Sequence, residues 1–343
     1  MNKVIFFVAG GTGGHLFPAI AVAKSFKKSQ SHFLVDKRTE KILLDNDYKY
    51  HIISSGKLDK NIFKVLISFF KIFYGFIHSF YLITKFKPSL VIGFGGYTSI
   101  PTLLAAKILN KRILIHEQNS VMGKTNRFLS KISTKIAITY KNTIYADKSA
   151  IVSGMPIRNL KAKKDIYKDH KKIILIIGGS QGAKVFSEII KNIILRLDKS
   201  LLKKIFVVHQ VREEDLKSMK NFYQNLNIAF KVEKFFKNIY DEINSSDIVI
   251  SRCGASSLAE IEYFQKFCIL IPLPTSANNH QYYNAVEFKK TNNCEIISQS
   301  NINNDKLVKI IKSNLFEKKN KKIKQIRKTK KMSLVNIIND MLQ

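Results

Sequence analysis

The residues with the clearest chemical potential lie in glycine-rich turns that follow apolar runs. The run Val4 to Val8 leads into Gly10-Gly11-Thr12-Gly13-Gly14-His15, and an apolar helical pattern begins after it. Such a turn aims the backbone amides of a helix N-terminus at an anion, and its glycines let a ligand approach the backbone. Because His15 and Leu16 end the run, it fits neither the P-loop pattern nor the dinucleotide pattern GxGxxG.

His15 is a candidate general base, because an imidazole can accept a proton from a hydroxyl near neutral pH. A capping or buried histidine is the alternative. Polar loops are expected after two further strands, Gly93-Phe94-Gly95-Gly96-Tyr97 and His116-Glu117-Gln118-Asn119. Loops beyond the carboxyl ends of parallel strands line the ligand crevice of a doubly wound sheet. These polar residues are therefore expected to face a ligand.

The second half of the chain repeats this arrangement. Gly178-Gly179-Ser180-Gln181-Gly182 follows another apolar run, and Gly254-Ala255-Ser256-Ser257 opens another helix. Glu260, in the first turns of that helix, could bind ribose hydroxyls as the acidic residue of dinucleotide sites does, or act only on the helix dipole. The segment His280 to Asn284 is expected to be a loop whose amides suit sugar hydroxyls.

The elements that must position these residues have the pattern of buried parallel strands. Short continuous apolar runs alternate with helical stretches, which predicts an α/β class with doubly wound sheets. The predicted strands are Val4 to Val8, Phe33 to Val35, Leu90 to Ile92, Ile113 to Ile115, Ile136 to Ile138, Ile173 to Ile177, Phe206 to Val208, Ile248 to Ile250 and Ile269 to Ile271.

A length of 343 residues suits two such domains. The pattern restarts after Gly154 to Arg158 and the Lys-rich stretch Lys161 to Lys172, so the predicted domains are 1–157, joined by the C-terminal segment 328–343, and 158–327. Lys318 to Lys331 is dominated by basic residues, and an apolar-periodic helix, Met332 to Leu342, closes the chain.

Composition excludes some classes of function and leaves others open. The net charge of +33 could indicate nucleic acid, anionic membrane or acidic ligands, or only a Lys-rich composition. No nucleic-acid motif supports the first of these, so no nucleic-acid partner is expected. Cys253, Cys268 and Cys294 lie far apart, which predicts neither a zinc site nor a disulfide framework. The N-terminal apolar run ends in glycines and is predicted to be a strand, not a signal peptide.

Residues 62–83 form a long hydrophobic stretch. Lys64, Lys71, His78 and Lys85 recur every seven positions, with Ser68 and Gly75 between them, and so form a polar stripe on an apolar helix. Interior lysines disfavour a membrane span, whereas a helix in the membrane interface keeps the stripe wet. Anionic lipid would attract these lysines. The alternative is a helix that simply packs on the sheet. The side chains expected to insert are Phe69, Phe70, Phe73, Phe76 and Phe80.

Eight motifs extend in order over nearly the whole chain: GGTGGH, FGGY, HEQN, GKTN, GMPIR, GGSQGA, SRCGASSLAE and HQYYNA. Together they resemble the MurG family, the UDP-N-acetylglucosamine:undecaprenyl-diphospho-muramoylpentapeptide N-acetylglucosaminyltransferases of bacterial peptidoglycan synthesis. The resemblance implies a GT-B fold, with two Rossmann-like domains facing across a cleft. It also implies a peripheral protein on the cytoplasmic face of the inner membrane, in contact with anionic lipids, that converts UDP-N-acetylglucosamine and lipid I into lipid II.

The resemblance also assigns residues. Phe236 would contact uracil through its backbone, Glu260 would bind ribose, and Ser180 would bind the diphosphate. The residues assigned to UDP-N-acetylglucosamine are Thr12, Gly13, Gly14, Asn119, Arg158, Ser180, Phe236, Arg252, Ala255, Ser256, Ser257, Glu260, His280, Gln281 and Asn284. Those assigned to the acceptor are Gly11, Tyr97, His116 and Asn126.

The family inverts at the anomeric carbon, which requires one base. His15 is the first choice, and Glu117 is the reserve. No cofactor or metal is expected, and any divalent ion would be non-essential. Two residues depart from the family's pattern: Met155 stands where Asn is usual, and Ser187 where Asn is common. The alternatives are another lipid glycosyltransferase of this fold, such as a diacylglycerol sugar transferase, and a basic membrane adaptor without catalysis.

Overall fold

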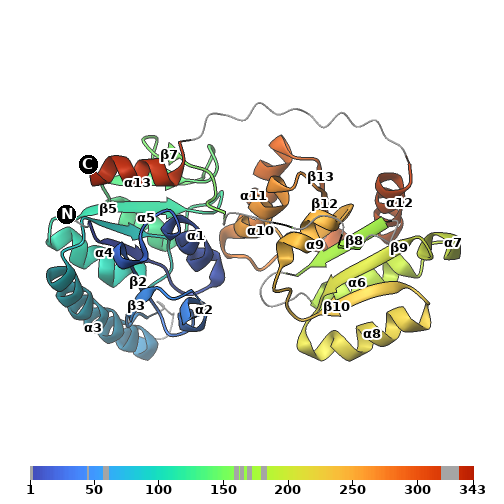
Figure 1. Ribbon diagram of the computed structural model, residues 1–343, viewed down its shortest axis with the longest axis horizontal. Coiled ribbons are helices and arrows are strands. Elements are labelled where there is room, and N and C mark those ends of the chain that lie inside the picture. Colours follow the sequence, from blue (N-terminus) through green and yellow to red (C-terminus); the bar gives the residue numbers. More distant parts are fainter. Residues whose placement is uncertain are drawn as a thin grey trace. The chain divides into compact units, whose positions relative to one another are not determined.

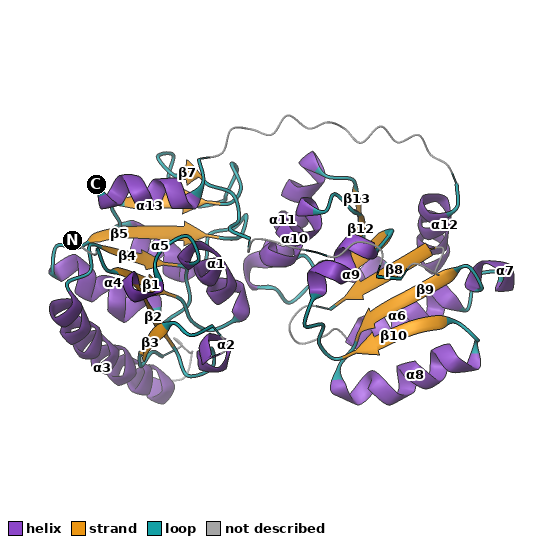
Figure 2. Cartoon of the chain, in the orientation of Figure 1, coloured by secondary structure: helices purple, strands orange, loops and turns teal. Residues whose placement is uncertain are grey.

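The computed structural model describes residues 3–44, 46–56, 62–157, 162, 166–167, 172–178, 184–317 and 332–343. The chain divides into two compact units, Met1–Asn159 with Lys328–Gln343, and Leu160–Arg327. Each unit is a parallel sheet between helices (Figures 1 and 2). The basic stretch Lys318 to Lys331 lies outside the described residues.

The first unit contains a seven-stranded sheet in the order β3-β2-β1-β4-β5-β6-β7. Its order reverses between β1 and β4, and the carboxyl ends of strands at such a switch point form the usual ligand crevice of this fold. The strands are β1 (Ile5–Val8), β2 (Ser31–Val35), β3 (Lys49–Ile52), β4 (Leu90–Gly93), β5 (Arg112–Glu117), β6 (Lys135–Ile138) and β7 (Ile151–Val152).

Helices cover both faces of this sheet. On one face, α1 (Gly13–Ala23), α2 (Glu40–Leu44) and the C-terminal α13 (Leu334–Leu342) share a core. Ile337 and Ile338 of α13 are fully buried in it, so the end of the chain stabilises the unit that contains its beginning (Figure 1). On the other face lie α3 (Ile62–Phe86), α4 (Ser99–Ile108) and α5 (Lys124–Ser130).

The second unit has six strands in the equivalent order, β10-β9-β8-β11-β12-β13. They are β8 (Lys172–Ile177), β9 (Ile205–Gln210), β10 (Ala229–Glu233), β11 (Ile248–Ser251), β12 (Phe267–Leu270) and β13 (Cys294–Ile296). One face is covered by α6 (Lys184–Ile194), α7 (Lys199–Leu202), α8 (Leu216–Asn225) and α12 (Asn304–Leu315), and the other by α9 (Ile239–Ser245), α10 (Ala255–Tyr263) and α11 (His280–Thr291).

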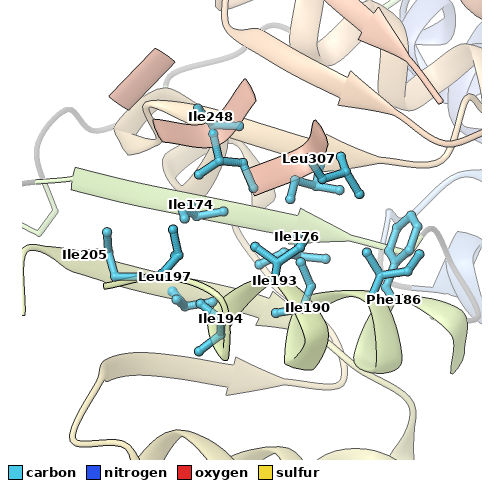
Figure 3. Packing of buried hydrophobic residues seen from close by; sticks show 14 of the residues in the cluster. Ile174, Ile176, Phe186, Ile190, Ile193, Ile194, Leu197, Ile205, Ile248 and Leu307 are labelled. Carbon is cyan, nitrogen blue, oxygen red and sulfur yellow. The ribbon is translucent and has the colours of Figure 1, made fainter. Parts of the chain in front are cut away.

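The apolar stripe of α6 shows how this core forms. Phe186, Ile190, Ile193 and Ile194 recur at helical spacing, and all of them point toward β8 and its neighbours (Figure 3). Leu307 of α12 joins the same cluster. Fully buried aliphatic side chains of this size each contribute about 1.5–3 kcal/mol to stability.

All nine strands predicted from the sequence are confirmed. The prediction missed β3, β7, β10 and β13, which are the strands at the four sheet edges. Edge strands are half exposed, so they do not give continuous apolar runs. The three cysteines are free and buried.

Helix α3 corrects part of the polar-stripe prediction. Ser68 and Gly75 do not face water: Ser68 is buried, and a Cβ at Gly75 would lie 1.9 Å from the Ser54 carbonyl oxygen. Phe76 and Phe80 pack against the core, so they are not free to insert into lipid. Small residues in the stripe instead allow α3 to approach the domain closely.

Candidate active site

The first glycine turn is held from the end of the neighbouring strand. Oδ2 of Asp36, which follows β2, accepts hydrogen bonds from the Gly11 amide at 2.6 Å and from Thr98 Oγ1 at 3.3 Å. Arg38 Nη2 donates to the same oxygen at 2.8 Å. Burial raises the pKa of Asp36, but Arg38 and the Gly11 amide outweigh it, so that the pKa lies below its ordinary value. The ionised carboxylate thereby fixes the turn.

His15 lies in the first helical turn of α1, where the glycine turn meets the loop after β4. Its Nδ1 is 3.2 Å from Gln118 Oε1. A Cβ at Gly95, whose φ is +93°, would lie 3.1 Å from His15 Cε1, so glycine is needed for the ring to pack there. No partner for His15 Nε2 is recorded among the described residues, and the imidazole is half-buried.

Glu117 is an anchor whose oxygens are fully engaged. Oε1 accepts hydrogen bonds from the amide of Asn119 at 2.9 Å and from its Nδ2 at 3.2 Å. Oε2 accepts from the Gly123 amide at 3.0 Å and from Asn126 Nδ2 at 2.8 Å. Glu117 and Asn126 are each only 2% exposed. This geometry argues against Glu117 as the general base and gives it the role of holding the loop 118–126.

His116 and Glu117 are the last residues of β5, not part of a loop. The His116 ring is fully buried, with Nε2 at 3.1 Å from the Gly154 carbonyl oxygen and Nδ1 at 3.2 Å from Gln118 Nε2. Burial lowers the pKa of His116 to about 4, so the ring is neutral at physiological pH. Both nitrogens are occupied, which argues against direct contact between His116 and an acceptor.

Arg252 of the second unit is also turned inward. Nη1 donates to the carbonyl oxygens of Ile271 and Pro272 at 3.0 and 3.1 Å, and Nη2 donates to Gln299 Oε1 at 2.8 Å. Its guanidinium carbon lies 5.0 Å from the centre of the Phe186 ring, and burial lowers its pKa. Arg252 therefore braces the ends of β11 and β12, and this geometry argues against direct contact with a nucleotide.

The segment expected as a loop at His280 is the start of α11. Gln281 Oε1 accepts from the amides of Cys253 and Leu273 at 3.2 and 3.0 Å. The buried Asn284 donates from Nδ2 to the Cys253 carbonyl oxygen at 3.0 Å. These bonds tie α11 to the turn before α10. Because Asn284 is buried, its side chain supports this packing instead of lying open to a ligand.

Helix α10 begins after Gly254 with no side-chain cap, so its first amides are open to an anion. Ala255 is buried, Ser256 and Ser257 are half-buried, and Glu260 Oε1 accepts from the Tyr240 hydroxyl at 3.2 Å.

Phe236, in the loop after β10, is 5% exposed and packs in the core. Its neighbour Phe235 is 65% exposed. The aromatic face available on this loop is therefore that of Phe235.

The remaining assigned residues are placed as follows. Thr12 and Gly14 are exposed at the start of α1, Gly13 and Tyr97 are half-buried, and His280 Nδ1 donates to the Ala277 carbonyl oxygen at 2.8 Å. Two residues depart from the family's pattern: Met155 Sδ lies 3.9 Å from Thr139 Oγ1, and Ser187 Oγ lies 3.5 Å from Asp215 Oδ2. Arg158 and Ser180 lie outside the described residues.

The sequence does not predict Asp36 or Phe235 as site residues, and it predicts Gln118 only as part of a polar loop that faces a ligand, with no role of its own. For Asp36 a signal exists, because an acidic residue after the second strand is a familiar feature of Rossmann-type units. Gln118 lies inside the quoted HEQN motif, but its contact with His15 joins residues 103 positions apart and depends on the tertiary fold.

Comparisons with known proteins agree over most of the chain. Residues 5–138 match the model of the glycosyltransferase family 28 N-terminal domain, and residues 173–341 match that of the C-terminal domain. Two relatives are named UDP-N-acetylglucosamine–N-acetylmuramyl-(pentapeptide) pyrophosphoryl-undecaprenol N-acetylglucosamine transferase. That of Rickettsia bellii is 36% identical over 99% of this chain and all of its own, and that of Rickettsia canadensis is 39% identical over 89% and 88%.

Among solved structures, the MurG crystal structure of Acinetobacter baumannii aligns with a TM-score of 0.74 at 26% identity. The alignment covers 92% of this chain and 91% of that one. The predicted class, an α/β protein with two Rossmann-like domains of the GT-B type, is thereby confirmed.

Proposed function

The chain belongs to glycosyltransferase family 28, and from that membership and its relatives we infer that it is a UDP-sugar-dependent N-acetylglucosaminyltransferase of peptidoglycan synthesis. It transfers N-acetylglucosamine from UDP-N-acetylglucosamine to lipid I, the undecaprenyl-pyrophosphoryl N-acetylmuramyl-(pentapeptide), and gives lipid II. The observation that carries this function is the 36% identity to the Rickettsia bellii transferase over 99% of this chain and all of that one.

The chemistry that we propose is a single displacement with inversion. The 4-hydroxyl oxygen of the acceptor's muramyl residue bonds to the anomeric carbon, and the bond from that carbon to the UDP oxygen breaks. The hydroxyl proton moves to His15 Nε2, the ring nitrogen opposite the one that Gln118 holds. A positioned base of this kind contributes about 10²–10⁴-fold to the rate.

We assign the acceptor to the first unit and UDP-N-acetylglucosamine to the second. This proposal moves four residues of the first unit from the sugar nucleotide to the acceptor: Thr12, Gly13, Gly14 and Asn119. The Gly11 turn, with Arg38 and the open amides of α1, suits an anion such as the acceptor's diphosphate. The open start of α10 suits the UDP diphosphate, where helix amides would stabilise the charge of the leaving group. This assignment requires no metal or other cofactor.

We further propose that the outer face of α3 attaches the enzyme to an anionic membrane surface. Lys71 and Lys85 are exposed beside this face. By length and composition, Val65–Phe86 could also cross a bilayer, but its opposite face packs in the core of the first unit. A helix with one face in a protein core and one apolar face outside fits attachment at the interface. The outward side chains that are more than half exposed are Phe63, Leu66, Ile67, Phe69, Phe70, Phe73, Tyr74, Ile77 and Tyr81.

The test of function incubates the full-length protein with radiolabelled UDP-N-acetylglucosamine and lipid I, and separates the lipid products by chromatography. Lipid II is the expected product, and its formation should continue in the presence of EDTA. Product from diacylglycerol but none from lipid I would contradict the assignment.

His15→Ala should lower kcat about 10²–10⁴-fold and leave UDP affinity nearly unchanged. Unchanged turnover would exclude His15 as the base.

A further inference from the structure

A chain of hydrogen bonds runs from the Gly154 carbonyl oxygen to His15, and its direction is fixed at its inner end. A carbonyl oxygen only accepts, so His116 Nε2, at 3.1 Å from it, must carry a proton. Because the buried His116 ring is neutral, its Nδ1 carries no proton and accepts a hydrogen bond from Gln118 Nε2 at 3.2 Å.

Two further carbonyl oxygens fix the orientation of the Gln118 amide. Its Nε2 lies 3.0 Å from the Phe94 carbonyl oxygen and 3.1 Å from that of His116. In the flipped orientation, the amide oxygen would face these two acceptors and the lone pair of His116, with no hydrogen to share. Gln118 is 2% exposed, so no bulk water relieves such a conflict. Oε1 therefore points at His15.

The outer end of the chain follows from this orientation. Gln118 Oε1 lies 3.2 Å from His15 Nδ1 and can only accept, so Nδ1 carries the ring proton of the neutral His15. The lone pair is then on Nε2. The neighbouring Gly95 leaves the ring just enough space in this orientation, because any Cβ there would approach Cε1 and Nδ1 within 3.2 Å.

We propose that Gln118 is a positioning residue for the transfer reaction: it holds His15 in the Nδ1–H tautomer and so presents the basic Nε2 to the acceptor hydroxyl. This inference rests on the proposed function and adds the residue that sets the state of the base. An amide neither gains nor loses a proton here, so the proton taken from the hydroxyl remains on His15 until it leaves to solvent. Gln118 acts only through orientation and tautomer.

The tautomer can be measured without any substrate. In full-length protein labelled with ¹⁵N, the two ring nitrogens of His15 are distinguished by their shifts and ring couplings, with His15→Gln as the assignment control. The wild-type spectrum above neutral pH should show a protonated Nδ1 and an unprotonated Nε2. In Gln118→Met, which has a similar length but no hydrogen-bonding amide, the Nδ1–H form should lose its dominance. A wild-type ring protonated at Nε2 would overturn the proposal.

Kinetics provides the second measurement. Gln118→Met should lower kcat about tenfold or more and change KM for UDP-N-acetylglucosamine by less than about twofold. Thr139→Val is the matched control, because it removes a buried hydrogen bond to the Glu117 carbonyl oxygen without touching His15, and its kcat should stay close to wild type. A Gln118→Met enzyme that keeps its kcat would refute the proposed positioning role of Gln118. Loss of all transfer by the wild type would refute the proposed function instead, and the spectrum would still decide the tautomer.

Discussion

Removal of two phenylalanines from the outer face of α3 should release the protein from anionic vesicles. Phe70 and Phe73 are 60% and 54% exposed, which together is slightly more than one whole side chain. Taking about 200 Å² for that side chain and about 25 cal/mol per Å², complete insertion is worth about 5–6 kcal/mol. Insertion only to the headgroup boundary halves this to about 3 kcal/mol, or a roughly 100-fold change in partition.

The assay is co-sedimentation of purified Phe70→Ser/Phe73→Ser protein with vesicles of phosphatidylglycerol and phosphatidylethanolamine. Tyr263→Ser is the matched control, because Tyr263 is 51% exposed but belongs to α10 in the other unit. Phe76 is unsuitable, because it packs against the core and its replacement would weaken the fold. If the double variant binds vesicles as the wild type does, with an unchanged melting temperature, the α3 face is not the attachment surface.

Two further predictions concern the buried residues of β5. Glu117→Gln places an amide where the carboxylate accepts hydrogen bonds from four donors, so it should lower the free energy of unfolding by about 2–4 kcal/mol. Urea denaturation measures this change. A loss below about 0.5 kcal/mol would show that Glu117 is not the loop anchor. Because burial depresses the pKa of His116 to about 4, stability present above pH 6.5 should be lost as pH falls toward 4. The loss of stability due to the His116 ring should amount to about 3 kcal/mol. Melting curves measured over this pH range should therefore show a smaller loss of stability for His116→Gln than for the wild type. Equal losses in the two proteins would contradict the prediction.

Local sequence was enough to identify the fold class. Runs such as Ile173 to Ile177 are buried on both faces, so their apolar character is continuous. The edge strands could not be found in this way. Tyr50 and His51 of β3, for example, have one face near solvent, and only pairing with β2 makes this segment a strand.

The sequence by itself also indicated which motifs are candidates for the site and which family they resemble, because motif order along the chain requires no coordinates. Only the tertiary structure decided what each side chain does. His116, Glu117 and Gln118 are consecutive, yet one ring is sealed against Gly154, one carboxylate anchors a loop and one amide holds His15. These roles depend on partners brought together from other strands, and on burial, which decides whether a polar group is occupied or open.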